Sequence, residues 1–328
     1  MSSIRLFLLL PLCLIQFVAP VDTLSAQSPC GDQSIMDQKG AWNKRNDANM
    51  SGGKDQAAIL RRLDQISELF KAAYPDPKGI QPNWYRTMGD NTLVRDGPIP
   101  YNFNSLYLSW YCNTNLKKIM LSDETGTWAY VFVNNFGFFL SDQYDRLHLK
   151  VNGNAVYVLP AKKGEWKGYP LYQASPYPGK SQCILVTRNN QPPWQPISQQ
   201  QYLDALRQQW EEQRSKISSS PPMTKYLDDK IAVLDNYQKH SDPSTLRSPA
   251  ILNRNMVEEF KGQFSTELAG GLQLVTVDPG YFNSKLPAYV PQLMVLLWRW
   301  DKSVPAQDFK KTFEANFAPD QLKNMLDK

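Results

Sequence analysis

The chain has 328 residues and a formal charge of +5, and its 36 basic and 31 acidic side chains are interspersed. No run of lysine and arginine supplies the positive stripe that phosphate binding needs, which argues against a nucleic-acid partner. Only two histidines are present, and neither has a second ligand at the usual spacing, so we expect no metal and no cofactor.

The N-terminus has the pattern of a secretory signal peptide. Arg5 precedes an apolar run, residues 6–19, that is too short to span a bilayer, and Ala26 offers a small residue for cleavage before Gln27. We therefore expect residues 1–26 to be removed and the protein to be exported, to the periplasm or the extracellular space. After removal of the signal peptide no segment is apolar and long enough for a membrane span.

Two N-terminal regions are expected to follow the signal peptide. Residues 27–54 are polar and contain several glycines, which predicts a poorly ordered leader. Residues 55–100 are predicted to hold one helix and then an irregular connection rich in proline and glycine. The helix is indicated by apolar residues at a spacing of three and four, namely Ile59, Leu63, Ile66, Phe70 and Ala73.

Residues 101–197 form the predicted antiparallel β region. About a fifth of the residues from 101 to 187 are aromatic, against 12% for the whole chain, and this enrichment is typical of strands. The Asn152–Gly153 dipeptide predicts a two-residue hairpin, and the segment 127–133 is apolar on both faces, which predicts a central strand. The expected strands are 106–112, 116–122, 127–133, 147–151, 155–159, 165–172 and 182–187.

Residues 198–328 form the predicted helical region with two further strands. Pro192, Pro193 and Pro196 form a stiff corner, after which Ser198 and Gln201 have the spacing of a capping box. The expected helices are 199–217, 223–240, 255–267, 306–316 and a last turn from 319, and the expected strands are 272–277 and 292–300.

The predicted fold class is therefore α+β. An antiparallel β meander, as a sandwich or a half-open barrel, is expected to pack with helices. The C-terminal helical pair and the extra strands are expected to share one continuous core with the β region.

Three cysteines remain after cleavage of the predicted signal peptide: Cys30, Cys112 and Cys183. Cys112 and Cys183 are the favoured disulfide pair, because both lie in predicted strands of one sheet. The other pairings stay open, and so does the alternative that all three are free.

No constellation in the sequence assigns catalytic residues. His148 lies beside a predicted turn and His240 ends a predicted helix, and no serine lies in a Gly-x-Ser-x-Gly turn. Glycoside hydrolysis needs two opposed carboxylates, which neighbouring residues in a turn rarely provide. The carboxylate pairs considered are Asp123 with Glu124, Asp142 with Asp145, and Glu258 with Glu259.

Aromatic side chains are the candidates for ligand binding. Trp166, Tyr169, Trp194 and Trp110 could present flat faces to a sugar or a peptide from the sheet. The alternative is that they pack the core, as most sheet aromatics do. Trp166 is flanked by charged residues and is the one expected to be most exposed.

Two segments carry a resemblance to known sequences. They are Glu-Trp-Lys-Gly-Tyr-Pro-Leu-Tyr at 165–172, with the strand and proline corner after it, and Asp-Pro-Gly-Tyr-Phe at 278–282, with the prolines that follow. Over about two thirds of its length the chain resembles exported proteins of Bacteroidota-type bacteria, to which no activity is assigned. The resemblance implies export and a single unit, and it transfers no catalytic residue.

The leading functional hypothesis is a non-enzymatic exported module that binds a glycan, a peptide or an envelope protein. One alternative is a secreted hydrolase of polysaccharide or peptide that uses carboxylates. Another is a structural or assembly component of the cell envelope. The last would show an exposed apolar patch along Leu203, Leu206, Trp210 and Leu227.

Overall fold

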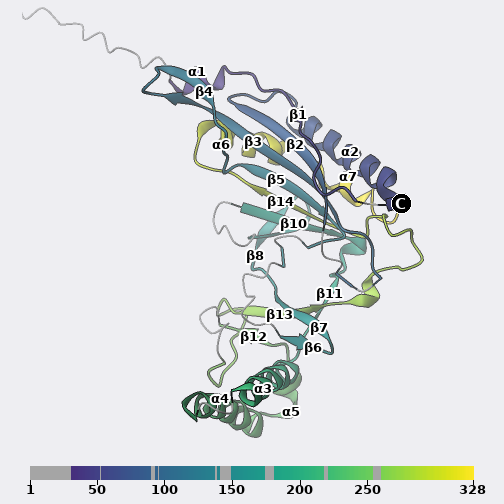
Figure 1. Ribbon diagram of the computed structural model, residues 1–328, viewed down its shortest axis with the longest axis vertical. Coiled ribbons are helices and arrows are strands. Elements are labelled where there is room, and N and C mark those ends of the chain that lie inside the picture. Colours follow the sequence, from purple (N-terminus) through teal and green to yellow (C-terminus); the bar gives the residue numbers. More distant parts are fainter. Residues whose placement is uncertain are drawn as a thin grey trace, which may run out of the picture.

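Four layers follow one another along the long axis of the molecule: helices, a large sheet, a smaller sheet and a second group of helices (Figure 1). The mixed α+β class with large antiparallel sheets is confirmed. The computed structural model describes residues 31–51, 53–89, 93–94, 96–136, 139–140, 149–173, 181–217, 221–253 and 260–328.

The large sheet has nine strands in the described part of the chain, in the order β1-β2-β3-β5-β14-β10-β9-β8, with β4 paired to β3. All pairs are antiparallel except β1 with β2. The strands are β1 (Asn43–Lys44), β2 (Ile80–Met88), β3 (Tyr101–Asn113), β4 (Lys118–Leu121), β5 (Trp128–Val133), β8 (Lys162–Trp166), β9 (Tyr169–Tyr172), β10 (Ser181–Thr187) and β14 (Leu293–Arg299).

The predicted antiparallel sheet is confirmed, but a strand from near the end of the chain, β14, is inserted into it. This strand is the last in the sequence, yet it lies between β5 and β10 and pairs with both along its length. Its residues are apolar on both faces: Met294 and Trp298 face the first helical layer, whereas Val295 and Leu297 face the smaller sheet. A strand buried on both faces suits the middle of a sheet, and β14 takes that place beside the correctly predicted central strand β5.

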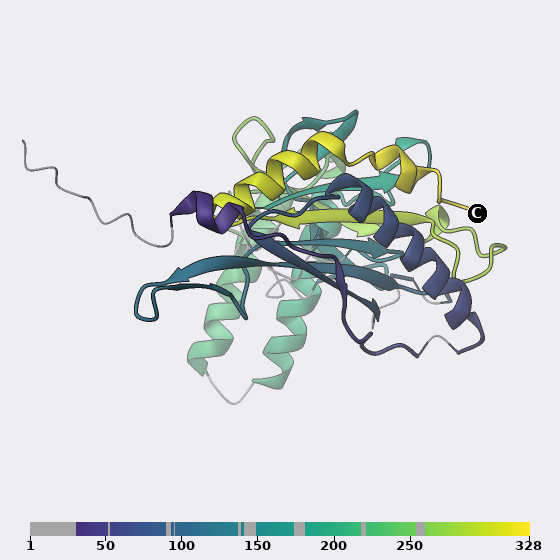
Figure 2. The same cartoon turned by 90° about the horizontal axis from the view of Figure 1, so that it is seen from above.

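Helices α2 (Gln56–Ala73), α6 (Val304–Asn316) and α7 (Pro319–Lys323) cover one face of the large sheet. The predicted apolar stripe of α2 is buried there, and Phe70 meets Phe103 of β3 at 4.7 Å and Phe313 of α6 at 5.4 Å between ring centroids. Seen from above, α2 and α6 lie over the strands (Figure 2). The aromatic enrichment of the β region thus fills a core shared by both ends of the chain.

Two N-terminal segments are more regular than predicted. Residues 31–51, expected to be a poorly ordered leader, contain α1 (Asp32–Met36) and β1, and Trp42 is anchored by an indole hydrogen bond of 2.9 Å to Tyr74 O. Residues 80–88, expected to be irregular, form β2. Pro82 is tolerated in β2 because its β3 partner, Tyr107, uses its amide and carbonyl on the other side, with Thr127 and Thr125. On the opposite edge β1 pairs only with Asn83 and Trp84, so neither neighbour requires an amide at Pro82.

The smaller sheet has the order β11-β13-β7-β6, with β12 paired to β13. The predicted hairpin is confirmed, because Asn152 and Gly153 have φ of 51° and 80° between β6 and β7. Leu272 and Leu274 of β13 face the second helical layer, and Val275 and Val277 face the large sheet. The strands are β6 (Lys150–Val151), β7 (Asn154–Val158), β11 (Trp194–Pro196), β12 (Ile251–Leu252) and β13 (Leu272–Val277).

The predicted antiparallel helical pair is confirmed as α3 (Gln199–Lys216) and α4 (Pro221–His240), followed by α5 (Pro243–Arg247). Ser198 and Gln201 form the capping box in both directions. Figure 2 shows the pair side by side, extending beyond the strands. The exposed apolar patch that an assembly component would show is not formed by these residues, because all four are buried: Leu203, Leu206, Trp210 and Leu227.

The predicted helix 255–267 is not formed in its described part. Residues 254–259 lie outside the described residues, and residues 260–266 are not helical. Gly262 has φ of 82°, which a helix does not accept, and Phe260 and Phe264 turn their rings toward Tyr202 and Tyr237. The aromatic spacing that suggested a helix instead belongs to an irregular segment that covers α3 and α4.

The favoured disulfide between Cys112 and Cys183 is also wrong. Cys112 is disulfide-bonded, whereas Cys183 is a free, fully buried thiol whose pKa is raised by burial. The two cysteines lie in β3 and β10, which are not neighbours, since β5 and β14 separate them. Cys13 and Cys30 lie outside the described residues, as does the whole predicted signal peptide.

Among the described helices, none combines the length and the apolar character needed to cross a bilayer.

Candidate functional site

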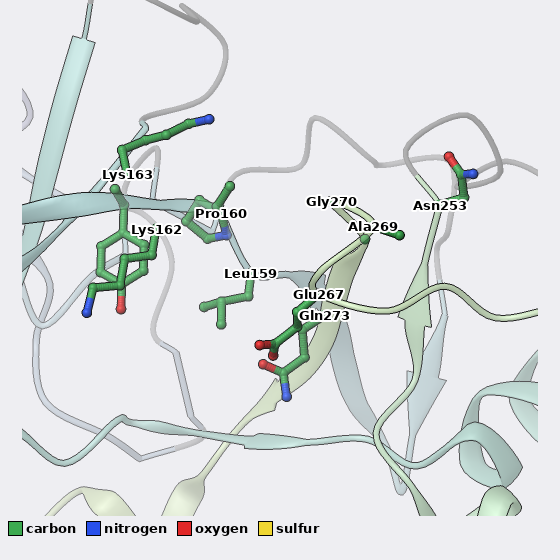
Figure 3. A pocket seen from close by; sticks show the side chains of 12 residues that line it. Leu159, Pro160, Lys162, Lys163, Asn253, Glu267, Ala269, Gly270 and Gln273 are labelled. Carbon is green, nitrogen blue, oxygen red and sulfur yellow. The ribbon is translucent and has the colours of Figure 1, made fainter.

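A cleft of about 840 Å³ opens where the edge of the large sheet meets the smaller sheet. Strands β8 and β9 form one wall, with Lys162, Lys163 and Tyr172. The opposite wall comes from the start of β13 and the turn before it, with Glu267 and Gln273 (Figure 3). The two walls therefore belong to different layers of the molecule.

The floor of the cleft is the chain segment that passes from one sheet to the other. Leu159 follows β7, and its amide donates to Gln273 O at 2.8 Å in the smaller sheet. Two residues later Ala161 O accepts from the amide of Gln173, at 3.3 Å, beside the large sheet. Because this crossing segment is tied at both ends, the distance between the two walls is fixed by backbone hydrogen bonds.

A tight turn at residues 267–271 shapes the second wall. Gly270 has φ of 74°, and its amide donates to Glu267 O at 2.9 Å. Gly271 approaches its neighbours so closely that a Cβ there would lie 2.5 Å from Ile251 Cγ2. The turn thus needs glycine at both positions. Glu267 and Gln273 extend side by side toward Leu159 (Figure 3).

Four polar side chains of the cleft have unused hydrogen-bonding capacity. Lys162 and Lys163 offer ammonium donors, Glu267 offers carboxylate acceptors, and Gln273 offers an amide that both donates and accepts. None of these four side chains makes a hydrogen bond or ion pair within the described part of the chain. They are therefore available to a polar ligand.

Tyr172 adds an aromatic face to the same cleft. Its ring is half-buried and packs edge-on against Phe139, with centroids 5.0 Å apart. Burial raises the pKa of its hydroxyl, and the Cys183 thiol beneath raises it further. The hydroxyl therefore stays protonated at neutral pH and can both donate and accept a hydrogen bond.

The β8–β9 hairpin places two of the four predicted ligand residues in the core. Trp166 is half-buried rather than exposed, with its ring 4.9 Å from that of Trp298 and its indole Nε1 donating to Glu314 O at 3.3 Å. The Tyr169 hydroxyl donates to Asp320 at 2.7 Å. Between them, Lys167 Nζ donates to the carbonyl oxygens of Ala315 and Phe317 at 2.6 and 2.8 Å.

The Trp-Lys-Gly-Tyr motif thus attaches the large sheet to the end of α6 and the start of α7. We expect Lys167→Ala to lower the free energy of unfolding by about 1–2 kcal/mol, because it leaves carbonyls at the negative end of the α6 dipole without their cation. Urea denaturation would measure this change.

Lys117→Ala is the matched control, because Lys117 also has positive φ in a hairpin turn, at 48° against 50° for Lys167, but its side chain makes no hydrogen bond within the described part of the chain. An equal loss in both variants would show that the turn conformation, and not the helix contact, carries the effect.

The other two predicted ligand residues lie elsewhere. Trp194 lies on β11 between the two sheets, with its ring 5.6 Å from Phe139. Trp110 lies on β3, half-buried opposite Leu121 of β4, at another edge of the large sheet. The four aromatic residues therefore do not converge on one surface, and none of them lines the cleft.

Sequence reasoning missed the four polar residues of the cleft. Lys162 and Lys163 follow the predicted strand 155–159. Glu267 ends the predicted helix 255–267, and Gln273 is the second residue of the predicted strand 272–277. Polar residues are common at such places. The one local signal is the Gly270–Gly271 pair, which equally suits the end of the predicted helix 255–267 and so does not by itself indicate a turn that shapes a wall.

The candidate catalytic groups do not form a constellation in the described residues. Asp123 and Glu124 are exposed in the β4–β5 connection, and His240 ends α4 with its ring Nδ1 2.8 Å from Asn236 O. No group of three potential metal ligands occurs in the part of the chain that the structure describes. His148, Asp142, Asp145, Glu258 and Glu259 lie outside the described residues.

The Asp-Pro-Gly-Tyr-Phe motif has a packing role. Gln292 is buried, and its side chain both accepts from the amide of Asn283 at 2.7 Å and donates to Asn283 O at 3.2 Å. The Tyr281 hydroxyl donates to Gln292 O at 2.9 Å. A hollow of about 220 Å³ remains beside this segment. The motif therefore holds the long connection that leads into β14.

No protein-family model, curated protein or solved structure matches this chain. The resemblance to exported Bacteroidota-type proteins stays a prediction, and function has to be argued from the geometry of the site.

Proposed function

We propose that this protein is an exported, non-enzymatic binding protein that holds a glycan in the cleft between its two sheets. The observation that carries the proposal is the set of four polar side chains without internal partners, Lys162, Lys163, Glu267 and Gln273, around a cleft of about 840 Å³. Sugars present hydroxyl groups to such donors and acceptors and an apolar face to residues such as Leu159 and Tyr172.

A peptide is the weaker candidate, because the strand at the rim is protected against strand addition. Peptides commonly bind by extending the exposed edge of a sheet. Strand β8 is an edge strand, but it carries Lys162, Lys163 and Glu165 and has a register irregularity between Lys162 and Gly164. Charged side chains and bulges are the features by which edge strands avoid pairing. A ligand that binds through side chains fits this wall better.

Export is supported by the disulfide at Cys112 together with the signal-peptide pattern of the N-terminus. Disulfides persist in oxidising compartments and are rare in the cytosol.

Peptide mapping of the secreted protein without reduction should find Cys183 as a free thiol and Cys112 in a disulfide. If the chain is cleaved before Gln27, Cys30 is the one cysteine left to pair with Cys112 within the chain, so we expect that linked peptide. Recovery of Cys112 as a free thiol from exported material would contradict both the bond and the argument for export. The fully buried Cys183 serves as the internal control, because it should react with a thiol reagent only after unfolding.

A glycan array, followed by calorimetry on the mature full-length protein, tests the proposed function. Gln273→Ala and Glu267→Gln are each expected to weaken binding about tenfold, since the first removes an amide and the second replaces a carboxylate acceptor with a donor. Gln195→Ala is the matched control, because Gln195 is an exposed glutamine of β11 in the same small sheet but does not line the cleft. An array without a binder, or an equal loss in the control, would refute the proposal.

The hydrolase alternative makes a different prediction for the same cleft. Retaining and inverting glycosidases place two carboxyl groups about 5–9.5 Å apart. Among the described residues that line the cleft, Glu267 is the one carboxylate. We therefore expect the bound glycan to be recovered intact, as measured by reducing-end release. Turnover that disappears in Glu267→Gln would favour the hydrolase instead.

A further inference from the structure

We propose that the glycan in the cleft carries an anionic group, a carboxylate or a phosphate, that binds to Lys162 and Lys163. This inference rests on the proposed function and names the ligand class of the same site. The anion would lie at the β8 wall, with the neutral part of the sugar directed toward Glu267 and Gln273 (Figure 3).

An irregularity in β8 allows both lysines to line the cleft. Successive residues of a regular strand point to opposite faces, so Lys162 and Lys163 would normally lie on different sides of the sheet. The register of β8 against β9 shifts between Lys162 and Gly164, and Gly164 has φ of 154°. Bulges are known to redirect side chains beside functional sites. Here the shift accompanies two adjacent lysines that both line the cleft. Their side chains extend in different directions (Figure 3), and their flexible four-carbon stems would turn toward a shared anion when it binds.

The ammonium groups of Lys162 and Lys163 are also free to bind a ligand, unlike those of two other lysines in this region. Lys167 binds the carbonyl groups at the end of α6, and Lys310 forms an ion pair of 3.0 Å with Glu314. Lys162 and Lys163 have no hydrogen-bond or ion-pair partner within the described ranges, although Glu165 lies on the same strand. Their ammonium groups can therefore bind an anionic ligand without breaking an internal contact.

Glu267 on the opposite wall sets the orientation of the ligand. Its carboxylate repels an anion and accepts hydrogen bonds from hydroxyl or acetamido groups, and the Gln273 amide beside it can do both. The cleft thus has a cationic wall and an acceptor-rich wall. A sugar with its acid at one end matches this polarity, whereas a neutral sugar leaves the lysines unpaired.

The test uses an array of disaccharide pairs, each printed as the neutral sugar, its uronate and its 6-phosphate, with the mature full-length protein. We expect an acidic form to bind about tenfold more tightly than its neutral counterpart at low salt, and the preference to shrink as salt is added. In the double variant Lys162→Gln/Lys163→Gln the preference should disappear, so that each acidic form binds no more tightly than its neutral counterpart. Lys150→Gln, an exposed lysine of β6 outside the cleft, is the control.

The outcomes separate this inference from the proposed function. Preference for the uronates alone or for the phosphates alone identifies the anionic group. Equal binding of neutral and acidic forms would overturn the inference and leave the proposed function intact. A preference that persists in the double variant would overturn the assignment to these lysines. Binding to none of the sugars would refute the proposed function itself. Circular dichroism of the variants, whose substituted side chains are exposed, verifies folding.

Discussion

Replacement of Asp47 with alanine is expected to lower the free energy of unfolding by about 3 kcal/mol, because the variant buries a charge without its main partner. Arg86 on β2 is only 6% exposed. Asp47 accepts three hydrogen bonds from it, from the backbone amide at 3.2 Å, Nε at 3.0 Å and Nη2 at 2.6 Å. Asp64 of α2 accepts from Nη1 at 2.8 Å but is half exposed and cannot replace Asp47. Chemical denaturation measures the loss.

Asp76→Ala is the matched control for Asp47→Ala. Asp76 is exposed and forms only a loose ion pair of 3.7 Å with Lys78, so its loss should change stability by less than about 0.5 kcal/mol. The double variant Asp47→Ala/Arg86→Met should recover part of the stability, because the buried charge is removed as well. If the double variant is no more stable than Asp47→Ala, the cost comes from the lost anchor of residues 45–48 and not from the unpaired charge.

The same ion pair predicts a dependence of stability on pH. Burial raises the pKa of Asp47, but the hydrogen bonds and charge of Arg86 outweigh burial and hold that pKa below its usual value. A carboxylate with a lowered folded-state pKa stabilises the protein above its unfolded pKa, which is about 4, and this contribution is lost as the pH falls through the folded value. Asp47→Ala should therefore lose less stability on acidification than the unmodified protein does.

Trp298→Ala is the second substitution with a large expected effect, about 3–5 kcal/mol. The residue is fully buried on β14, and its ring centroid lies 4.9 Å from that of Trp166 and 6.0 Å from that of Phe313. Its indole Nε1 donates to Glu314 at 2.9 Å. The substitution removes the contact between the central strand, the β8–β9 hairpin and α6 at once. Urea denaturation followed by tryptophan fluorescence and circular dichroism measures the change.

Two further variants show how much of the lost stability comes from the hydrogen bond of Trp298 and how much from its ring contacts. Trp298→Phe keeps most of the ring contacts and loses the hydrogen bond, so we expect a cost of about 1–2 kcal/mol. Trp300→Ala removes a half-buried tryptophan two residues later and should cost less than Trp298→Ala. A loss below about 1 kcal/mol in Trp298→Ala would show that this core collapses around the cavity at little cost.

Elements with a strong local signal could be predicted from the sequence. The apolar stripe of α2, the capping box before α3 and the Asn152–Gly153 turn each depend on residues within a few positions of one another. Strand β2 was missed because Pro82 argues against a strand unless its nitrogen faces away from the paired strand, and that orientation is visible only in three dimensions. The place of β14 was missed for the same reason, since pairing between distant segments leaves no local pattern.

The candidate site was harder to predict than the fold. Trp166 and Tyr169 have the side chains of a ligand surface, but the structure uses them to hold α6 and α7 against the sheet. Lys162 and Gln273 come from segments far apart in the chain and resemble ordinary surface residues in the sequence. Only the meeting of the two sheets brings them together. Composition identifies the residue types that could bind, and topology decides which of them face a cleft.

The insertion of β14 between β5 and β10 also determines the order in which the molecule can fold. Until the last part of the chain has been synthesised, β5 and β10 each have an open edge that β14 alone closes. Pairing between such distant segments is slow to form, and open edges invite association with other chains. The nascent protein therefore cannot complete its large sheet from the N-terminus onward, and two strand edges stay open to other chains until its C-terminal segment arrives.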